Sequence, residues 1–217
     1  MQASQPQSKP QSNSPRLLEG WPLLGVTSAL LLALAIAILA AMPGVDGIRM
    51  LIRATARTSL LFFLLAYIAA AAWTLWPGAA TRWLRANRRY LGLSFAVSHG
   101  IHALAIYALS QADPALFMVL TNPGSLISGG LAYVFIVLLA ATSFDRSAAW
   151  IGPRAWRVLH TVGLHFVWLS FVFTVGKRLG QGPFYAFALS LVFAALALRI
   201  AARLKRARAQ PQAKPLG

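Results

Sequence analysis

Long apolar stretches separated by short polar connections run through the chain from residue 21 onward. A helix needs about 17–25 apolar residues to cross a hydrocarbon core of about 30 Å. Stretches of this length lie near residues 21–42, 55–76, 91–111, 127–144, 155–176 and 183–203. Most connections between them carry adjacent Pro and Gly residues, which interrupt helices. The pattern predicts an all-α membrane protein, a bundle of six transmembrane helices.

The two ends of the chain differ in composition from this apolar part. Residues 1–20 are rich in Gln, Ser and Pro and cannot bury enough apolar area to order themselves, so we expect a disordered N-terminal tail. Residues 204–217 are expected to form a basic C-terminal tail. Between the tails we expect one six-helix transmembrane domain, residues 21–203.

Composition and charge agree with a membrane location. Hydrophobic residues make up 58% of the chain and charged residues 11%, whereas about a quarter of a soluble domain is charged. The net charge of +16 comes from 20 Lys and Arg against 4 Asp and Glu. These basic residues fall between and beyond the apolar stretches, which is typical of membrane topology rather than of a nucleic-acid groove. We therefore expect membrane lipid as a partner and no nucleic acid.

The distribution of basic residues also predicts the orientation. If successive connecting segments lie on opposite sides of the membrane, 14 Lys and Arg lie on the side of the N-terminus and 5 on the opposite side. Basic residues stay on the cytoplasmic side of a membrane. We therefore expect a multi-pass protein of a bacterial-type inner (plasma) membrane with both termini in the cytoplasm. The chain has no cysteine, which excludes disulfides and thiolate metal sites.

Four histidines lie inside the apolar stretches: His99 and His102 in the third, His160 and His165 in the fifth. An ionisable ring at bilayer depth is costly unless it is paired or coordinating, so it is a functional-site hypothesis by default. His99 and His102 are three residues apart and share a helix face, whereas His160 and His165 diverge by about 140°. Two histidine-bearing membrane helices that face each other can hold a haem iron from both sides.

Depth along the helices leaves the pairing open. Counted from the nearest polar residue on the outer side, His102 is level with His165, and His99 with His160. A pairing of His102 with His160 would be offset by about 9 Å at 1.5 Å per residue. Gly163 shares a face with His160, where the missing side chain would let a flat macrocycle approach the backbone.

Three segments resemble a known family. The stretch RRYLGLSFAVSHGIHALAIY is similar to the third helix of the ferric-reductase-like transmembrane domain superfamily, and SFDRSAAWIGPRAWRVLHTVGLH to its entry into the fifth helix. IRATARTSLLFFLLAY resembles the opening helix of the family. The likeness spans roughly residues 45–200. The superfamily includes the haem-binding membrane subunit of the periplasmic methionine sulfoxide reductase.

The resemblance implies His102 and His160 as the two axial ligands of a b-type haem. His99 and His165 are the substitutes, because motif and depth do not select the same pair. Arg89, at the entry to the third helix, is a basic anchor and a candidate contact for the haem propionates. Members with two haems carry another histidine where this chain has Phe173, so we expect one haem.

The function expected from this reading is electron transfer by a membrane b-type cytochrome, as part of a ferric-reductase-like oxidoreductase system. Flavin and nicotinamide domains are missing from the sequence, so electrons would come from a quinol of the quinone pool, a flavin at the membrane surface, or an oxidoreductase partner subunit. No catalytic acid or base is expected, because the acidic residues fall in tails and connections. The alternative is a haem-free membrane transporter or scaffold protein whose intramembrane histidines are structural.

Overall fold

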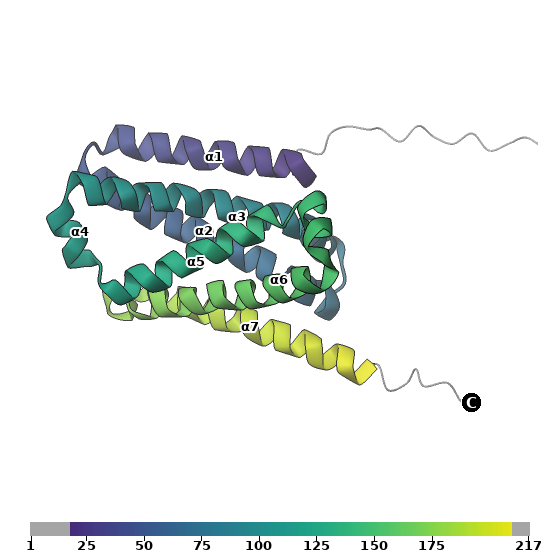
Figure 1. Ribbon diagram of the computed structural model, residues 1–217. Helices are drawn as coiled ribbons and strands as arrows, with labels where there is room; N and C mark the ends of the chain where they lie inside the picture. Colours follow the sequence, from purple (N-terminus) through teal and green to yellow (C-terminus); the bar gives the residue numbers. More distant parts are fainter. Residues whose placement is uncertain (1–17, 210–217) are drawn as a thin grey trace, which may run out of the picture.

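The protein is a bundle of helices in the computed structural model, which describes residues 18–209 (Figure 1). The elements in chain order are α1 (Gly20–Ala41), α2 (Val45–Leu75), α3 (Ala79–Ala112), α4 (Pro114–Leu120), α5 (Pro123–Ala141), α6 (Asp145–Gly176), the short 3₁₀ helix η1 (Leu179–Gln181) and α7 (Pro183–Ala209). Residues 18–209 contain no β-strand. Six of the helices, all except α4 and η1, are long and apolar enough to cross a membrane. The predicted fold class is therefore confirmed.

Several helices begin earlier than the sequence predicts, among them α2, and one helix was not predicted. α2 begins at Val45, ten residues before the expected span, because its amphipathic opening around Arg49 and Arg53 is helical as well. The connection after α3 contains the unpredicted helix α4. Its first turn is capped by the Asp113 carboxylate, which accepts a hydrogen bond from the backbone N–H of Leu116 at 2.9 Å.

The predicted tails fall largely outside the described residues. The expected N-terminal tail, residues 1–20, overlaps the structure only at its last three residues, and α1 begins at Gly20. At the other end α7 continues to Ala209, so the first six residues of the expected basic tail are helical. The rest of that tail, residues 210–217, lies outside the described part.

α2 is the central helix of the bundle. It packs against α1, α3 and α7, whereas α6 packs mainly on α5 and α7. Figure 1 shows that α1 begins and α7 ends at the same end of the bundle. We call this the basic end; α2 also ends there, and α3 and α6 begin there. Apolar side chains from α2, α3, α5, α6 and α7 form the main core, with Phe63, Phe95 and Phe171 in mutual ring contact.

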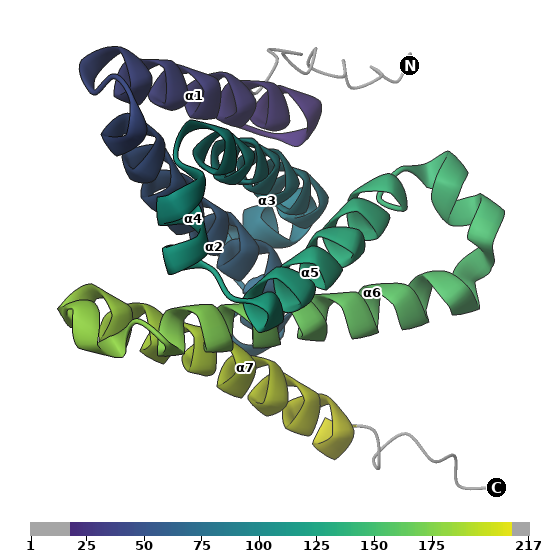
Figure 2. The same ribbon diagram turned by 60° about the vertical axis from the view of Figure 1, so that its left-hand side comes forward.

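α6 is bent near its start. Gly152 has φ 78° and ψ 162°, a left-handed backbone conformation that suits glycine. Pro153 follows it and supplies no N–H for a helical hydrogen bond. Figure 2 shows the first turns of α6 standing at a steep angle to the remainder. The straight part therefore begins at Pro153, close to the start of the predicted span 155–176.

Candidate functional site

The two histidines of α3 lie next to each other, as their spacing predicts. The ring centroids of His99 and His102 are 5.1 Å apart. Around His99 stand the rings of Phe95 at 5.3 Å, Tyr133 of α5 at 4.9 Å and Phe171 of α6 at 6.2 Å. His99 Nδ1 is buried and has no hydrogen-bond partner among residues 18–209. An unpaired imidazole nitrogen in an aromatic shell is therefore present inside the bundle.

His102 is anchored on α2. Its Nδ1 lies 3.0 Å from Thr55 Oγ1, and the Thr55 hydroxyl donates its own hydrogen to the carbonyl of Leu51 at 2.6 Å. Because that hydrogen is already used, the bond between the two side chains requires Nδ1–H of His102 to donate. The lone pair of the neutral ring is then on Nε2, which is the nitrogen available for coordination.

Hydroxyl groups continue this contact along the α2–α3 interface. Ser98 Oγ lies 2.8 Å from Thr58 Oγ1 and 2.9 Å from Ser59 Oγ, and α1 joins through Thr27 Oγ1, 2.7 Å from Ser94 Oγ. Hydrogen bonds of this kind hold membrane helices together. His102 is thus part of a polar seam that fixes α1, α2 and α3 relative to one another.

His160 faces the end of α5. Its Nε2 lies 2.9 Å from Thr142 Oγ1, and this hydroxyl donates to the carbonyl of Leu138 at 2.6 Å. Nε2–H of His160 must therefore be the donor. The ring also stacks on Trp156 at 4.1 Å, whose indole N–H donates to the backbone carbonyl of Thr142 at 2.9 Å. The lone pair of the neutral His160 ring is then on Nδ1.

His165 has the opposite arrangement. Its Nδ1 lies 2.7 Å from the carbonyl oxygen of Thr161, so Nδ1–H donates and Nε2 carries the lone pair. Tyr67 of α2 is the nearby aromatic residue, edge-on at 6.0 Å between ring centroids. Metal-ligating histidines are commonly held by a hydrogen bond from the other ring nitrogen to a protein oxygen. His102, His165 and His160 all have this feature, but in His160 the nitrogen left free is Nδ1 rather than Nε2.

Phe171 of α6 is in ring contact with both His99 and Phe95 of α3, at 6.2 Å each, so the His99 contact gives the smallest separations that this register allows. Both helices run from the basic end, so sequence offsets from this contact give separations along the bundle. At 1.5 Å per residue, His165 lies about 9 Å and His160 about 16 Å from the level of His99. From the level of His102 the corresponding separations are about 14 Å and about 21 Å.

The level pairings expected from depth therefore differ from the observed register. The expectation placed the outer ends of the two helices in one plane. α3 instead continues to Ala112, thirteen residues past His99, whereas α6 ends at Gly176, five residues past Phe171. Among the four possible pairs between the helices, His99 with His165 has the smallest separation.

Gly163 has a different neighbour from the one predicted. A Cβ at this position would lie 3.2 Å from both Phe135 Cδ1 and Leu139 Cδ1 of α5. The missing side chain therefore allows α5 and α6 to pack closely, and the space beside it is filled by apolar side chains.

Arg89 also has other partners. Its Nη1 lies 3.0 Å from Asp145 Oδ1 at the start of α6. The guanidinium group stands over the rings of Trp21 at 5.7 Å and Phe144 at 5.9 Å. In this arrangement Arg89 connects the beginnings of α1, α3 and α6. Its contact with a haem propionate stays a prediction.

The two helices offer imidazole nitrogens, which are the donor type of a bis-histidine haem. A haem iron needs two imidazoles rather than a larger ligand cluster, and residues 18–209 contain no group of three or more His, Cys, Asp or Glu that could hold a metal ion. Both helices supply an imidazole with a free nitrogen. One iron bound from both helices requires a register of α3 against α6 that differs from the one described above.

Sequence reasoning did not find several neighbours of the histidines. Thr55, Tyr133 and Thr142 are far from them in sequence and belong to no motif, so only the packing shows the contacts. Arg199 lies within the last expected span, residues 183–203, and its contact is also visible only in the packing. In the structure it lies ten residues before the end of α7, and its Nη1 donates to the carbonyl of Tyr67 at 2.7 Å.

Comparison of the chain with protein-family models, with curated proteins and with solved structures finds no match. The likeness to the ferric-reductase-like superfamily is therefore carried by the three sequence segments alone.

Proposed function

We propose that this protein is a membrane b-type cytochrome that holds one haem between α3 and α6. The observation that carries the proposal is the unpaired, buried Nδ1 of His99 in an aromatic shell. A buried polar atom without a partner is costly, and coordination of a metal would give this nitrogen a partner. His165 supports it from the facing helix, because its Nε2 is free.

The axial pair is the point at which packing and resemblance differ. Packing favours His99 with His165, because this pair has the smallest separation along the bundle and the Nδ1 of His99 has no partner among the described residues. The resemblance implies His102 with His160. These two rings are hydrogen-bonded to threonines of α2 and of the α5–α6 turn. We propose His99 and His165 as the ligands and assign His102 and His160 to the support of the bundle.

When bound, the haem would supply one-electron redox chemistry, and the chain supplies its placement. Phe95, Tyr133 and Phe171 surround His99 with aromatic rings. An apolar surround is one of the features that set a haem potential. Electrons would enter from a quinol, a surface flavin or a partner subunit, as part of an oxidoreductase system.

A haem-free scaffold or transporter is the second candidate. It is favoured by the hydrogen bonds of His102 to Thr55, of His160 to Thr142 and of His165 to Thr161, since these give three of the four rings a partner without any cofactor. In that function the histidines would serve as polar contacts between helices. The unpaired nitrogen of His99 has no role in it.

The haem content of four single variants tests the ligand assignment. H99A, H102A, H160A and H165A would each be purified in the same detergent, and haem would be measured by the pyridine haemochrome method. We expect H99A and H165A to lose haem while they elute as folded protein. H102A and H160A should keep haem and unfold at lower temperature. Loss of haem from H102A and H160A alone would instead support the pair implied by the resemblance. Unchanged haem in all four variants would refute a histidine-held haem.

A further inference from the structure

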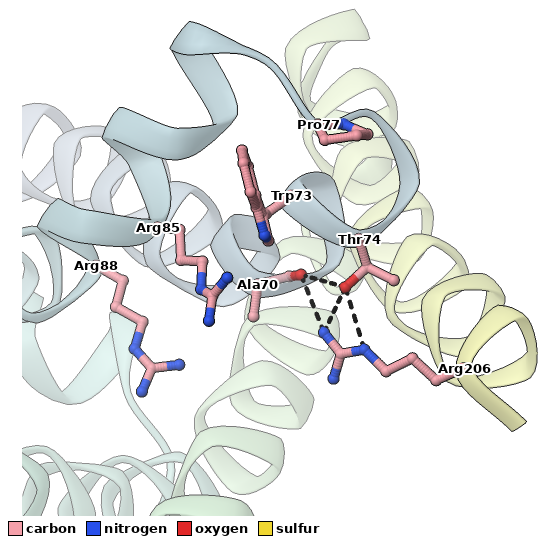
Figure 3. A pocket seen from close by; sticks show the side chains of 7 residues that line it. All are labelled: Ala70, Trp73, Thr74, Pro77, Arg85, Arg88 and Arg206. Carbon is pink, nitrogen blue, oxygen red and sulfur yellow. Dashed lines mark hydrogen bonds between the residues drawn. The ribbon is translucent and has the colours of Figure 1, made fainter. Parts of the chain in front are cut away.

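A pocket of about 570 Å³ opens at the basic end of the bundle, away from the α3 histidines. The end of α2, the first turns of α3 and the end of α7 surround it. Its lining consists of Ala70, Trp73, Thr74, Pro77, Arg85, Arg88 and Arg206. Figure 3 shows Arg85 and Arg88 extending from α3 on one side, with Arg206 of α7 on the other. The pocket lies where three membrane-length helices begin or end.

The charge of this pocket is entirely positive. Three guanidinium groups line it and no carboxylate does. Arg206 is held in place, since its Nε donates to Thr74 Oγ1 at 3.1 Å and Nη2 to the carbonyl of Ala70 at 3.3 Å. Arg85 and Arg88 have no hydrogen-bond acceptor within residues 18–209; Arg85 stands over the ring of Trp73 at 5.8 Å. Two arginines are thus free to bind an anion.

Two more unpaired donors lie deeper on the same helices. Tyr67 precedes Ala70 by one turn of α2, and its hydroxyl is buried and has no partner in the described part of the chain. Arg199, two turns before Arg206 on α7, stacks on the Tyr67 ring at 4.3 Å, and its Nε is also buried and unpaired. Below the pocket, Arg199 is held by its Nη1 bond to the carbonyl of Tyr67, while its Nε and the Tyr67 hydroxyl remain without an acceptor in residues 18–209.

We propose that this pocket binds the phosphate of an anionic phospholipid headgroup. Guanidinium groups form charge-assisted, bidentate hydrogen bonds with phosphate oxygens. Basic pockets between transmembrane helices are typical sites for acidic headgroups. The helix ends place this pocket at the level of the headgroups, and Trp73, Ala70 and Pro77 offer apolar surface for the glycerol region. The inference does not depend on haem.

A pair of charge-matched double variants tests the proposal in the full-length protein. R85Q/R88Q removes the two free arginines of the pocket. R154Q/R157Q is the control, because it removes two exposed arginines with the same three-residue spacing, also near the basic end and outside the pocket. Binding of phosphatidylglycerol and of phosphatidylcholine would be measured by native mass spectrometry from a neutral detergent. We expect wild type and R154Q/R157Q to prefer phosphatidylglycerol, and R85Q/R88Q to bind it about tenfold more weakly.

Two further arms keep the result interpretable. R85K/R88K keeps the positive charge and should keep part of the preference for phosphatidylglycerol. The comparison of the two lipids in the wild type needs no variant, so it holds even if a variant misfolds. Equal binding of both lipids by wild type, or equal loss in both double variants, would overturn the proposal. So would inorganic phosphate that displaces the lipid and binds the pocket by itself. A loss of haem from R85Q/R88Q without any change in lipid binding would likewise overturn it and assign the arginines to the haem.

Discussion

The imidazole of His102 donates a hydrogen bond from Nδ1 to the hydroxyl of Thr55, 3.0 Å away on the neighbouring helix. Thr55 is almost fully buried, and its hydroxyl donates a hydrogen bond to the carbonyl of Leu51. This pair is one end of the polar seam that continues through Ser98 to Thr58 and Ser59. The seam fixes the face of α3 that carries both histidines, and its loss has a measurable cost.

T55V keeps the shape of the side chain and removes the hydroxyl. We expect it to lower the free energy of unfolding by about 1–2 kcal/mol, because the ring N–H of His102 is left without this acceptor. Thermal unfolding in detergent measures the effect. T161V is the control, since Thr161 is exposed and its hydroxyl makes no hydrogen bond within residues 18–209. Equal midpoints for the two variants would show that the bond contributes nothing.

The contact of Gly163 with α5 predicts a position-dependent effect of added volume. G163L should lower the free energy of unfolding by about 1–3 kcal/mol, because the side chain would overlap Phe135 and Leu139. G100L on α3 is the matched change, since a Cβ there meets nothing within 4 Å. Denaturant unfolding should leave G100L within about 0.5 kcal/mol of wild type. A G163L variant as stable as G100L would mean that α5 and α6 are not packed closely at this glycine.

The pair of Arg89 with Asp145 predicts unequal effects at its two ends. The Asp145 side chain is 94% exposed, so D145N should change stability by less than about 1 kcal/mol. R89Q should cost more, because it also removes the contacts with Trp21 and Phe144. Thermal unfolding of both variants checks this order. Haem content provides the second readout: a loss of haem in R89Q but not in D145N would support the predicted propionate contact.

The absence of cysteine allows a direct test of orientation. A149C places a single thiol near the basic end, on an exposed residue of the first turns of α6, and Q181C places one on an exposed residue at the opposite end. If the basic end is cytoplasmic, a membrane-impermeant maleimide applied to intact cells should label Q181C and not A149C. Labelling of A149C alone would reverse the proposed orientation.

The spans were predictable because apolar length is a local property of the sequence. The errors arise where length alone is insufficient. The start of α2 carries arginines on one face and apolar residues on the other, so a search for continuous apolar residues begins too late. The bend at Gly152 was also missed, although the Gly-Pro pair that causes it is visible in the sequence.

The histidines were predictable as residues, but their partners were not. The three-residue spacing of His99 and His102 placed both on one face, as observed. The position of α3 relative to α6 along the bundle depends on how far each helix continues past its histidines. This length could not be predicted from the sequence. The hydrogen bonds to Thr55 and Thr142 come from other helices, so the ring nitrogen left free for coordination could be assigned only from the packing.

The most direct test of the cytochrome proposal is a dithionite-reduced minus air-oxidised difference spectrum of the detergent-purified protein, with a pyridine haemochrome assay on the same sample. The account predicts a b-type spectrum that sharpens on reduction, with about one haem per chain. A colourless protein purified from haem-replete cells would contradict the account and leave the haem-free scaffold or transporter as the function of this bundle.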